Sequence, residues 1–234
     1  MPERMNSFIS SDLFLLTLTT GLFCLGGIIY RRTRLALLHP VLLTFVAMIV
    51  FLQTTGIPYS RYQEATRILD FALGMSVVAL GYLLYEQVER LRGSLVPVAV
   101  ATLVGCVTGV LSVVYTAKAF GAERMILNSI APKSVTVPIA VSVSGPLGGN
   151  VSVTSVVVFC VGIFGSIFGE WILRRCGVRD PEARGFALGA AAHGIGTARA
   201  IEIGAVEGAL SGLAMALMGL ATALLTPWME KFLY

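Results

Sequence analysis

"APKSVTVPIA", residues 131–140, places two prolines and a lysine inside a part of the chain that is otherwise apolar. Pro132 and Pro138 cannot donate a backbone hydrogen bond, and each disfavours helical geometry at the residue before it. Backbone that leaves a helix at membrane depth is tolerated only where protein buries it or a watery cavity meets it. The stretch therefore predicts a broken helix inside the protein, with a cation, Lys133, at the break.

The composition of the whole chain indicates a membrane protein. Of its 234 residues, 56% are hydrophobic, only 13% are charged and 25 are glycine, whereas soluble domains are typically about 25% charged. Small residues are frequent in membrane helices because they let helices approach closely. The net charge of +4 fits basic loops on the cytoplasmic side of a membrane and does not indicate nucleic-acid binding.

Five apolar runs are long enough to span a bilayer, which takes about 20 residues. They lie at 12–30, 35–53, 94–117, 152–172 and 207–229. We interpret the first as a retained helix, because the N-terminal sequence lacks the small-residue cleavage site of a signal peptide. The prediction is an all-α polytopic membrane protein with about five full transmembrane helices.

Three further apolar stretches, 65–85, 125–147 and 183–204, carry glycine, proline or polar residues at their centres. We expect them to be broken or re-entrant helical segments. Each is followed by an uninterrupted run, and "FALG" occurs in both the first and the third stretch. Internal repeats of this kind are typical of secondary transporters.

We expect one integral membrane domain over residues 1–234. Two N-terminal helices would occupy residues 1–60, and a repeat-containing, transport-like core would occupy residues 65–234. The arginine-rich segments "RRTR" (31–34), "ERLR" (89–92) and "RRCGVRDPEAR" (174–184) belong in the cytoplasm by the positive-inside rule. This orientation places the N-terminus outside and makes 125–147 enter and leave the membrane on the outer side.

The first candidate site is the break around Lys133. Ser134 is a suitable N-cap for a half-helix beginning near Val135, and a helix N-terminus carries partial positive charge. With the lysine ammonium beside it, this helix end would bind an anion. The alternatives are a lysine at a loop tip in the headgroup region, or an intramembrane hydrolase with Ser134 as nucleophile and Lys133 or His193 as base.

The second candidate site lies in "AAHGIGTARAIE", residues 191–202, because ionisable groups inside a membrane mark functional sites by default. Arg199 offers a fork of donors to a carboxylate, or it pairs with Glu202 three residues on. His193 titrates near neutral pH and would couple transport to protons, or it is simply hydrogen-bonded within a helix bundle. Gly194 and Gly196 favour an unwound break.

Together, the candidate substrate-binding residues are Pro132, Lys133, Ser134, Thr136, His193, Gly194, Gly196, Thr197, Arg199 and Glu202. Thr136 and Thr197 are the candidates for a substrate hydroxyl. We interpret Glu170 and Glu207 as interfacial. The four cysteines show no disulfide or metal-site spacing, and soluble-enzyme motifs are absent from the sequence. We therefore expect no enzyme, no cofactor and no metal.

"LNSIAPKSVTVPIA" (127–140), "ARGFALGAAAHGIGTARAIE" (183–202) and "GALSGLAMALMGL" (208–220) resemble the LrgB/CidB family of bacterial membrane proteins. The resemblance covers most of the chain. It implies a multi-pass protein of the bacterial cytoplasmic membrane that is holin-like or antiholin-like and regulates murein hydrolase activity and cell lysis. It also implies a smaller membrane partner of the LrgA/CidA type. The family is related to the plastidal glycolate/glycerate translocator, which implies transport of glycolate, glycerate or pyruvate.

Two functions remain open at this point. One is a carrier for a small organic monocarboxylate, held by Lys133, Arg199 and half-helix ends. The other is an antiholin-like regulator that acts by assembling with its LrgA/CidA-type partner. In either case we expect a protein embedded in the lipid bilayer, assembled as a homo-oligomer and without a nucleic-acid partner.

Overall fold

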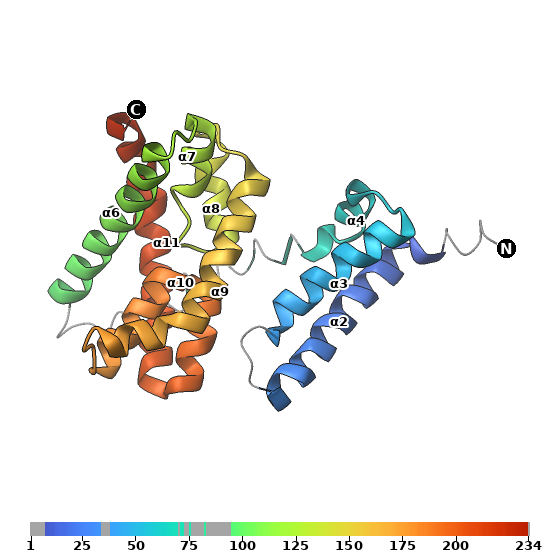
Figure 1. Ribbon diagram of the computed structural model, residues 1–234, viewed down its shortest axis with the longest axis horizontal. Helices are drawn as coiled ribbons and strands as arrows, with labels where there is room; N and C mark the ends of the chain where they lie inside the picture. Colours follow the sequence, from blue (N-terminus) through green and yellow to red (C-terminus); the bar gives the residue numbers. More distant parts are fainter. Residues whose placement is uncertain are drawn as a thin grey trace. The chain divides into compact units, whose positions relative to one another are not determined.

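The computed structural model describes residues 8–33, 38–69, 71–72, 75, 82 and 95–233, apart from the side chain of the last of these. Within the described residues every regular element is a helix (Figure 1), which confirms the all-α prediction. The chain divides into two compact units, Met1–Met75 and Ser76–Tyr234. The interrupted stretch predicted at 65–85 lies largely outside the described residues.

The first unit is a helical hairpin with a short helix against it. α2 (Asp12–Thr33) and α3 (Pro40–Thr55) are antiparallel, because Gly26 contacts Pro40 and Thr19 contacts Met48. α4 (Tyr59–Ala65) is tied to the start of α2 by an ion pair of 2.5 Å between Arg61 and Asp12.

Four of the described helices are long and apolar enough to cross a membrane: α2, α6 (Leu95–Ala119), α9 (Val151–Arg175) and α11 (Ala205–Leu233). The sequence predicted about five full spans, and the run expected at 35–53 forms a shorter apolar helix, α3. α3 begins at Pro40, because proline suits the first turn of a helix, and it has 16 residues. At 1.5 Å per residue it is about 24 Å long, shorter than a hydrocarbon core of about 30 Å.

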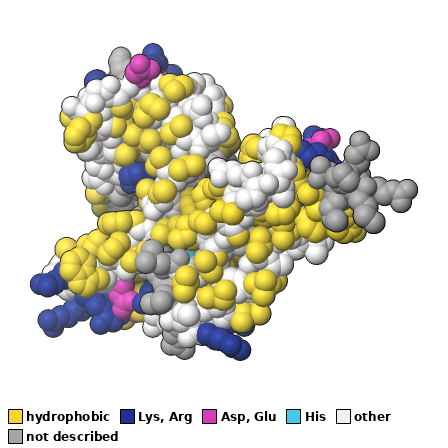
Figure 2. All heavy atoms as spheres, turned by 45° about the vertical axis from the view of Figure 1, so that its right-hand side comes forward, with side chains coloured by type: hydrophobic (Ala, Val, Ile, Leu, Met, Phe, Trp, Pro, Cys, Tyr) yellow, Lys and Arg dark blue, Asp and Glu magenta, His cyan; other side chains and the backbone are white. Residues whose placement is uncertain are grey.

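The second unit contains α6, α9 and α11 together with three helices that do not cross as single rods. These are α7 (Arg124–Ile130), α8 (Val137–Ser144) and α10 (Pro181–Ile203). Figure 2 shows hydrophobic side chains over much of the visible face and charged side chains in a few small groups. That distribution fits helices whose outer faces contact lipid.

α7, residues 131–136 and α8 form a helical hairpin, called hairpin 1 below. Its two ends lie side by side, because the Asn128 side-chain amide donates to the Leu147 carbonyl at 2.5 Å. The backbone N–H of Asn150 likewise donates to the Ser129 hydroxyl at 2.7 Å. The chain therefore leaves hairpin 1 beside the place where it began, as the sequence predicts for a re-entrant segment.

α10 is also a hairpin, called hairpin 2, because its helix is interrupted at Ala192 (φ −127°, ψ 15°) and His193 (φ 41°, ψ −134°). The chain folds back at this point and the two arms touch. A Cβ added to Gly196 would lie 2.6 Å from the Leu188 carbonyl oxygen, so only glycine fits where the returning arm passes the first.

Contacts with α11 show the direction of each arm of hairpin 2. Before the break they advance in the same direction along both helices: Gly185 with Glu207, then Gly189 with Ser211. After the break they advance in opposite directions: Gly194 with Met215, then Ile201 with Gly208. The first arm is thus parallel to α11 and the returning arm is antiparallel to it.

The two hairpins are inserted from opposite ends of the unit (Figure 1). α9 runs from hairpin 1 to hairpin 2, and α11 runs from hairpin 2 back to hairpin 1. The contacts that establish these directions are Thr154–Ser144 and Glu170–Arg199 for α9, and Glu207–Arg184 and Glu230–Arg124 for α11. Two spanning helices of opposite direction therefore separate the bases of the two hairpins.

Besides α6, the described part of the second unit consists of two similar segments, 124–175 and 181–233, each a hairpin followed by a spanning helix. Because α9 and α11 are antiparallel, the two segments form an inverted repeat. A buried hydroxyl pair occurs in both: Thr154 donates to Ser144 at 2.8 Å, and Thr197 and Ser211 share a bond of 2.9 Å. In each case the pair joins the returning arm of a hairpin to the helix that follows.

Candidate functional site

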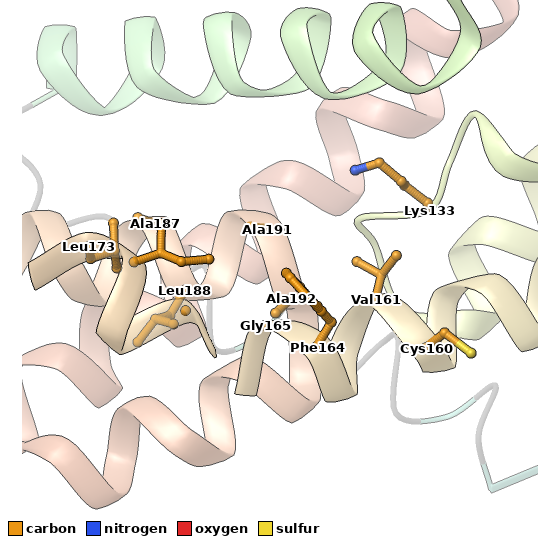
Figure 3. Close-up of a pocket in the computed structure, with 12 residues that line it drawn as sticks. Lys133, Cys160, Val161, Phe164, Gly165, Leu173, Ala187, Leu188, Ala191 and Ala192 are labelled. Atoms are coloured by element: carbon orange, nitrogen blue, oxygen red, sulfur yellow. The ribbon is translucent and has the colours of Figure 1, made fainter. Parts of the chain in front are cut away.

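A cavity of about 590 Å³ lies between α9 and the first arm of hairpin 2, with Lys133 from hairpin 1 at its edge. Figure 3 shows the Lys133 side chain reaching from the loop of hairpin 1 toward the arm that carries Ala187 and Ala191. The cavity is therefore the place where the two hairpins, inserted from opposite ends, come together. Inverted repeats of known transporters place their sites at such a junction.

Lys133 is half-buried and its ammonium group donates to the Ser134 hydroxyl at 2.9 Å. In the part of the chain that the structure describes, none of the seven ion pairs includes it. A charge removed from water without a partner is costly. The structure thus retains a cation at a position where the fold itself does not neutralise it.

The loop of hairpin 1 positions this lysine. Pro132 is fully buried and its carbonyl accepts a 3.4 Å bond from Val135. α8 begins at Val137 with Thr136 as its N-cap, which corrects the expectation that Ser134 caps a helix beginning near Val135. Pro138 explains the later start, because its missing N–H costs nothing in the first turn of a helix.

Thr136 shows an unusual feature for a capping residue. Its side chain makes no capping hydrogen bond, and its buried Oγ1 atom has no hydrogen-bond partner among the described residues. Buried hydroxyls without a partner are uncommon in folded proteins. Among the candidate residues of the hairpin 1 loop, two therefore keep polar groups that can still bind another molecule. These are Lys133, through its charge, and Thr136, through its hydroxyl.

His193 forms the tip of hairpin 2. Its φ of 41° is a conformation that favours glycine and is strained for other residues. The imidazole Nε2 lies 2.9 Å from the Val158 carbonyl oxygen of α9. Gly162 makes room for the ring, since a Cβ there would approach it to 2.7 Å. The contact agrees with the second interpretation of His193 from the sequence, a histidine hydrogen-bonded within the helix bundle.

The neighbouring candidates of hairpin 2 have structural contacts. The Thr197 hydroxyl donates to the His193 carbonyl at 2.8 Å and shares a bond with Ser211. Gly196 allows the two arms to touch, and Gly194 makes an ordinary contact with Met215. The break falls at Ala192 and His193, before the two glycines that were expected to form it.

Arg199 does not share a site with Lys133. It pairs with Glu202 and with Glu170, each at 2.9 Å, so the structural salt bridge considered from the sequence is present and extends to a second carboxylate. Glu170 lies twelve residues beyond Val158 along α9, which is about 18 Å at 1.5 Å per residue. Arg199 and Glu202 therefore belong to the base of hairpin 2, far from its tip.

The sequence did not predict the ion pair between Arg184 and Glu207. Arg184 and Glu207 form a 2.5 Å ion pair with side chains only 15% and 7% exposed, whereas Glu207 was expected at the interface. The pair fixes the first arm of hairpin 2 to the first turns of α11. The two partners are 23 residues apart, so the i,i+3 and i,i+4 spacings that predict ion pairs within a helix do not apply. Only the fold identifies this pair.

A family model described as "LrgB-like family" matches residues 19–232 of the chain. The chain is 30% identical over 230 residues to the holin-like protein CidB of Staphylococcus epidermidis, covering 98% of this chain and 100% of that protein. It is 34% identical over 205 residues to the uncharacterised protein YxaC of Bacillus subtilis, covering 88% and 89%.

The chain is also 30% identical over 210 residues to the antiholin-like protein LrgB of Bacillus cereus, covering 89% of this chain and 91% of that protein. No solved structure matches the chain. The matched range spans both compact units, so the similarity concerns nearly the whole chain and not one hairpin.

Proposed function

This chain belongs to the LrgB-like family, and from that premise we propose that it is a carrier for a small organic monocarboxylate of the glycolate, glycerate or pyruvate type. The observation that supports this most is Lys133. It is a cation without an acidic partner among the described residues, at the cavity where two opposed hairpins meet. An anion bound in the cavity would neutralise this charge, which would explain why a membrane protein keeps a lysine there.

The charge of the site favours a monoanion. One ammonium group neutralises one carboxylate, and the N-terminus of α8 adds partial positive charge. The Ser134 hydroxyl lies beside the ammonium group, and the same loop carries Thr136, whose buried hydroxyl has no hydrogen-bond partner among the described residues. Arg199 is not part of this proposal, because two carboxylates already neutralise it.

The inverted repeat supports movement between two access states. Each hairpin is tied at its base to a spanning helix, and its loop reaches the cavity from its own side of the unit. Small movements of one repeat against the other would expose the cavity to alternate ends, as in other inverted-repeat carriers. We place the base of hairpin 2 in the cytoplasm and the N-terminus outside, in the bacterial inner membrane, on the count of arginines.

A second candidate function has support of a different kind. The relatives are named holin-like and antiholin-like proteins, and these names favour a regulator of lysis and murein hydrolase activity more than any particular carboxylate. On this alternative the chain assembles with an LrgA/CidA-type partner, and with further copies of itself. Both proposals are non-enzymatic.

Uptake into proteoliposomes tests the carrier proposal. We expect saturable uptake of labelled pyruvate or glycolate by the wild type and its loss in Lys133→Ala. Ser134→Ala separates the carrier from a hydrolase: it keeps the cation, so a carrier should retain more uptake than Lys133→Ala does, whereas a hydrolase that uses Ser134 would lose all activity. Well-folded wild-type protein without saturable uptake would refute the carrier and leave the regulator, which is then tested by co-purification with the partner and by murein hydrolase activity.

A further inference from the structure

The cavity beside Lys133 is almost entirely apolar. Twelve residues line it, and Lys133 is the only one among them with a charge. One wall is α9, with Val161, Phe164 and Leu173, and the opposite wall is the first arm of hairpin 2, with alanines at 187 and 191. The lining therefore supplies one strong anion-binding group and almost no further hydrogen-bonding side chain.

The cation lies toward one end of this cavity. The lining residues of α9 extend from Cys160 to Leu173, which is about 20 Å of helix. Lys133 belongs to the hairpin 1 loop, whose Val135 packs with Val158 near the Cys160 end, and Figure 3 shows Leu173 on the opposite side of the view. An elongated apolar space thus extends from a single ammonium group.

We propose that the anion bound at Lys133 carries an apolar tail, as an aliphatic monocarboxylate does, and that the tail lies along α9. This inference rests on the proposed anion site and narrows its ligand class. A hydroxyl on the tail would lose its bonds to water against alanine, valine and phenylalanine without replacement. Each methylene buried there instead tightens binding by about fourfold. Among small monocarboxylates, the cavity should therefore bind those with an apolar tail more tightly than glycolate or glycerate.

Ala191 provides a direct way to test the position of the tail. It lines the cavity and its side chain is exposed, so a larger residue fills the space without crowding the core. Ala198 lies on the returning arm of the same hairpin, is also exposed, and is not among the lining residues. Ala191→Phe and Ala198→Phe are therefore a matched pair of variants.

Calorimetric titration of the full-length protein in nanodiscs gives the test. The probes are hexanesulfonate and 2-hydroxyethanesulfonate, which stay charged at all working pH values and differ in their tails. We expect hexanesulfonate to bind at least tenfold more tightly. Lys133→Gln should abolish this binding, Ala191→Phe should weaken it at least tenfold, and Ala198→Phe should leave it unchanged.

The possible failures are distinct. Equal or tighter binding of 2-hydroxyethanesulfonate, still dependent on Lys133, overturns the apolar tail and keeps the anion site. Hexanesulfonate binding that survives Ala191→Phe places the tail elsewhere and overturns the inference. Binding that survives Lys133→Gln reports adsorption to lipid or to an exposed apolar face. That result, or no binding of either probe, overturns both the anion site and its ligand class.

Discussion

Hairpins 1 and 2 have the same architecture but hold their charges differently. The two ends of hairpin 1 are joined by uncharged groups, such as the Asn128 amide on the Leu147 carbonyl, and one ion pair, Arg124–Glu230, links this base to α11. Its loop carries Lys133, which has no ionic partner among the described residues. The base of hairpin 2 is closed by ion pairs, and the histidine at its tip bonds to a backbone carbonyl.

This difference separates charges that the fold neutralises from one that it does not neutralise among the described residues. Arg184 and Arg199 both contact carboxylates that the fold supplies, so their charges stabilise the position of hairpin 2. Lys133 has a hydroxyl neighbour instead, so we expect its charge to lower the stability of the protein when no anion is bound. Removing charge should therefore destabilise one hairpin and stabilise the other.

The largest effect is expected at the base of hairpin 2. Glu207→Gln leaves Arg184 buried without its carboxylate, which should cost about 3–5 kcal/mol of unfolding free energy. Glu202→Gln is the control, since Glu202 is an exposed partner in a surface pair and its loss should cost less than about 1 kcal/mol. SDS titration of the purified protein measures both, and equal losses would contradict a special role for the buried pair.

The tip of hairpin 2 should show the next largest effect. His193→Ala removes the bond to the Val158 carbonyl but keeps the strained backbone, at a cost of about 2 kcal/mol. His193→Gly loses the same bond but relieves the strain, so it should recover about 1 kcal/mol of that loss. Thermal unfolding that ranks glycine below alanine would show that the backbone at this position is not strained.

A smaller loss is expected at the uncharged contact that joins the two ends of hairpin 1. Asn128→Ala leaves the Leu147 carbonyl without its donor and should destabilise by about 1–2 kcal/mol. Added salt should not change this value, because the lost bond involves no full charge. If the loss equalled that of Glu207→Gln, the two bases would not differ in the way the contacts indicate.

The smallest effect has the opposite sign. Lys133→Met removes a half-buried charge without an ionic partner, and should raise the unfolding free energy of the ligand-free protein by about 1 kcal/mol. The same variant should lose anion binding. A destabilised Lys133→Met protein would mean that the lysine has a structural role and would weaken the comparison between the two hairpins.

Local chemistry in the sequence predicts the breaks better than it predicts their partners. Pro132 and Pro138 stop the helix wherever hairpin 1 packs, so this break was predictable. At hairpin 2 the glycines pointed to the right stretch, but the turn falls at His193, because the ring contact with Val158 holds a strained residue there. His193 and Val158 are 35 residues apart, so the local sequence around His193 does not reveal their contact.

The repeat was predicted in part. The sequence indicated broken segments each followed by a full helix, and the structure contains two such segments in inverted order. The "FALG" identity stays untested, because the stretch that holds its first copy lies largely outside the described residues. The sequence predicted a broken or re-entrant segment at 183–204 but left open whether it crosses the membrane, since glycine-rich helices cross membranes as readily as they turn within them.

The opposed insertion of the two hairpins is the central claim, and cysteine labelling in whole cells tests it most directly. Glu123→Cys and Pro146→Cys flank hairpin 1, and the native Cys176 precedes hairpin 2; all three positions are exposed. Each would be the single cysteine of its variant, treated with a membrane-impermeant maleimide. We expect Glu123→Cys and Pro146→Cys to react from the same side, and Cys176 to react only from the other. Labelling of Glu123→Cys and Pro146→Cys from opposite sides would contradict the re-entrant hairpin and with it the inverted pair.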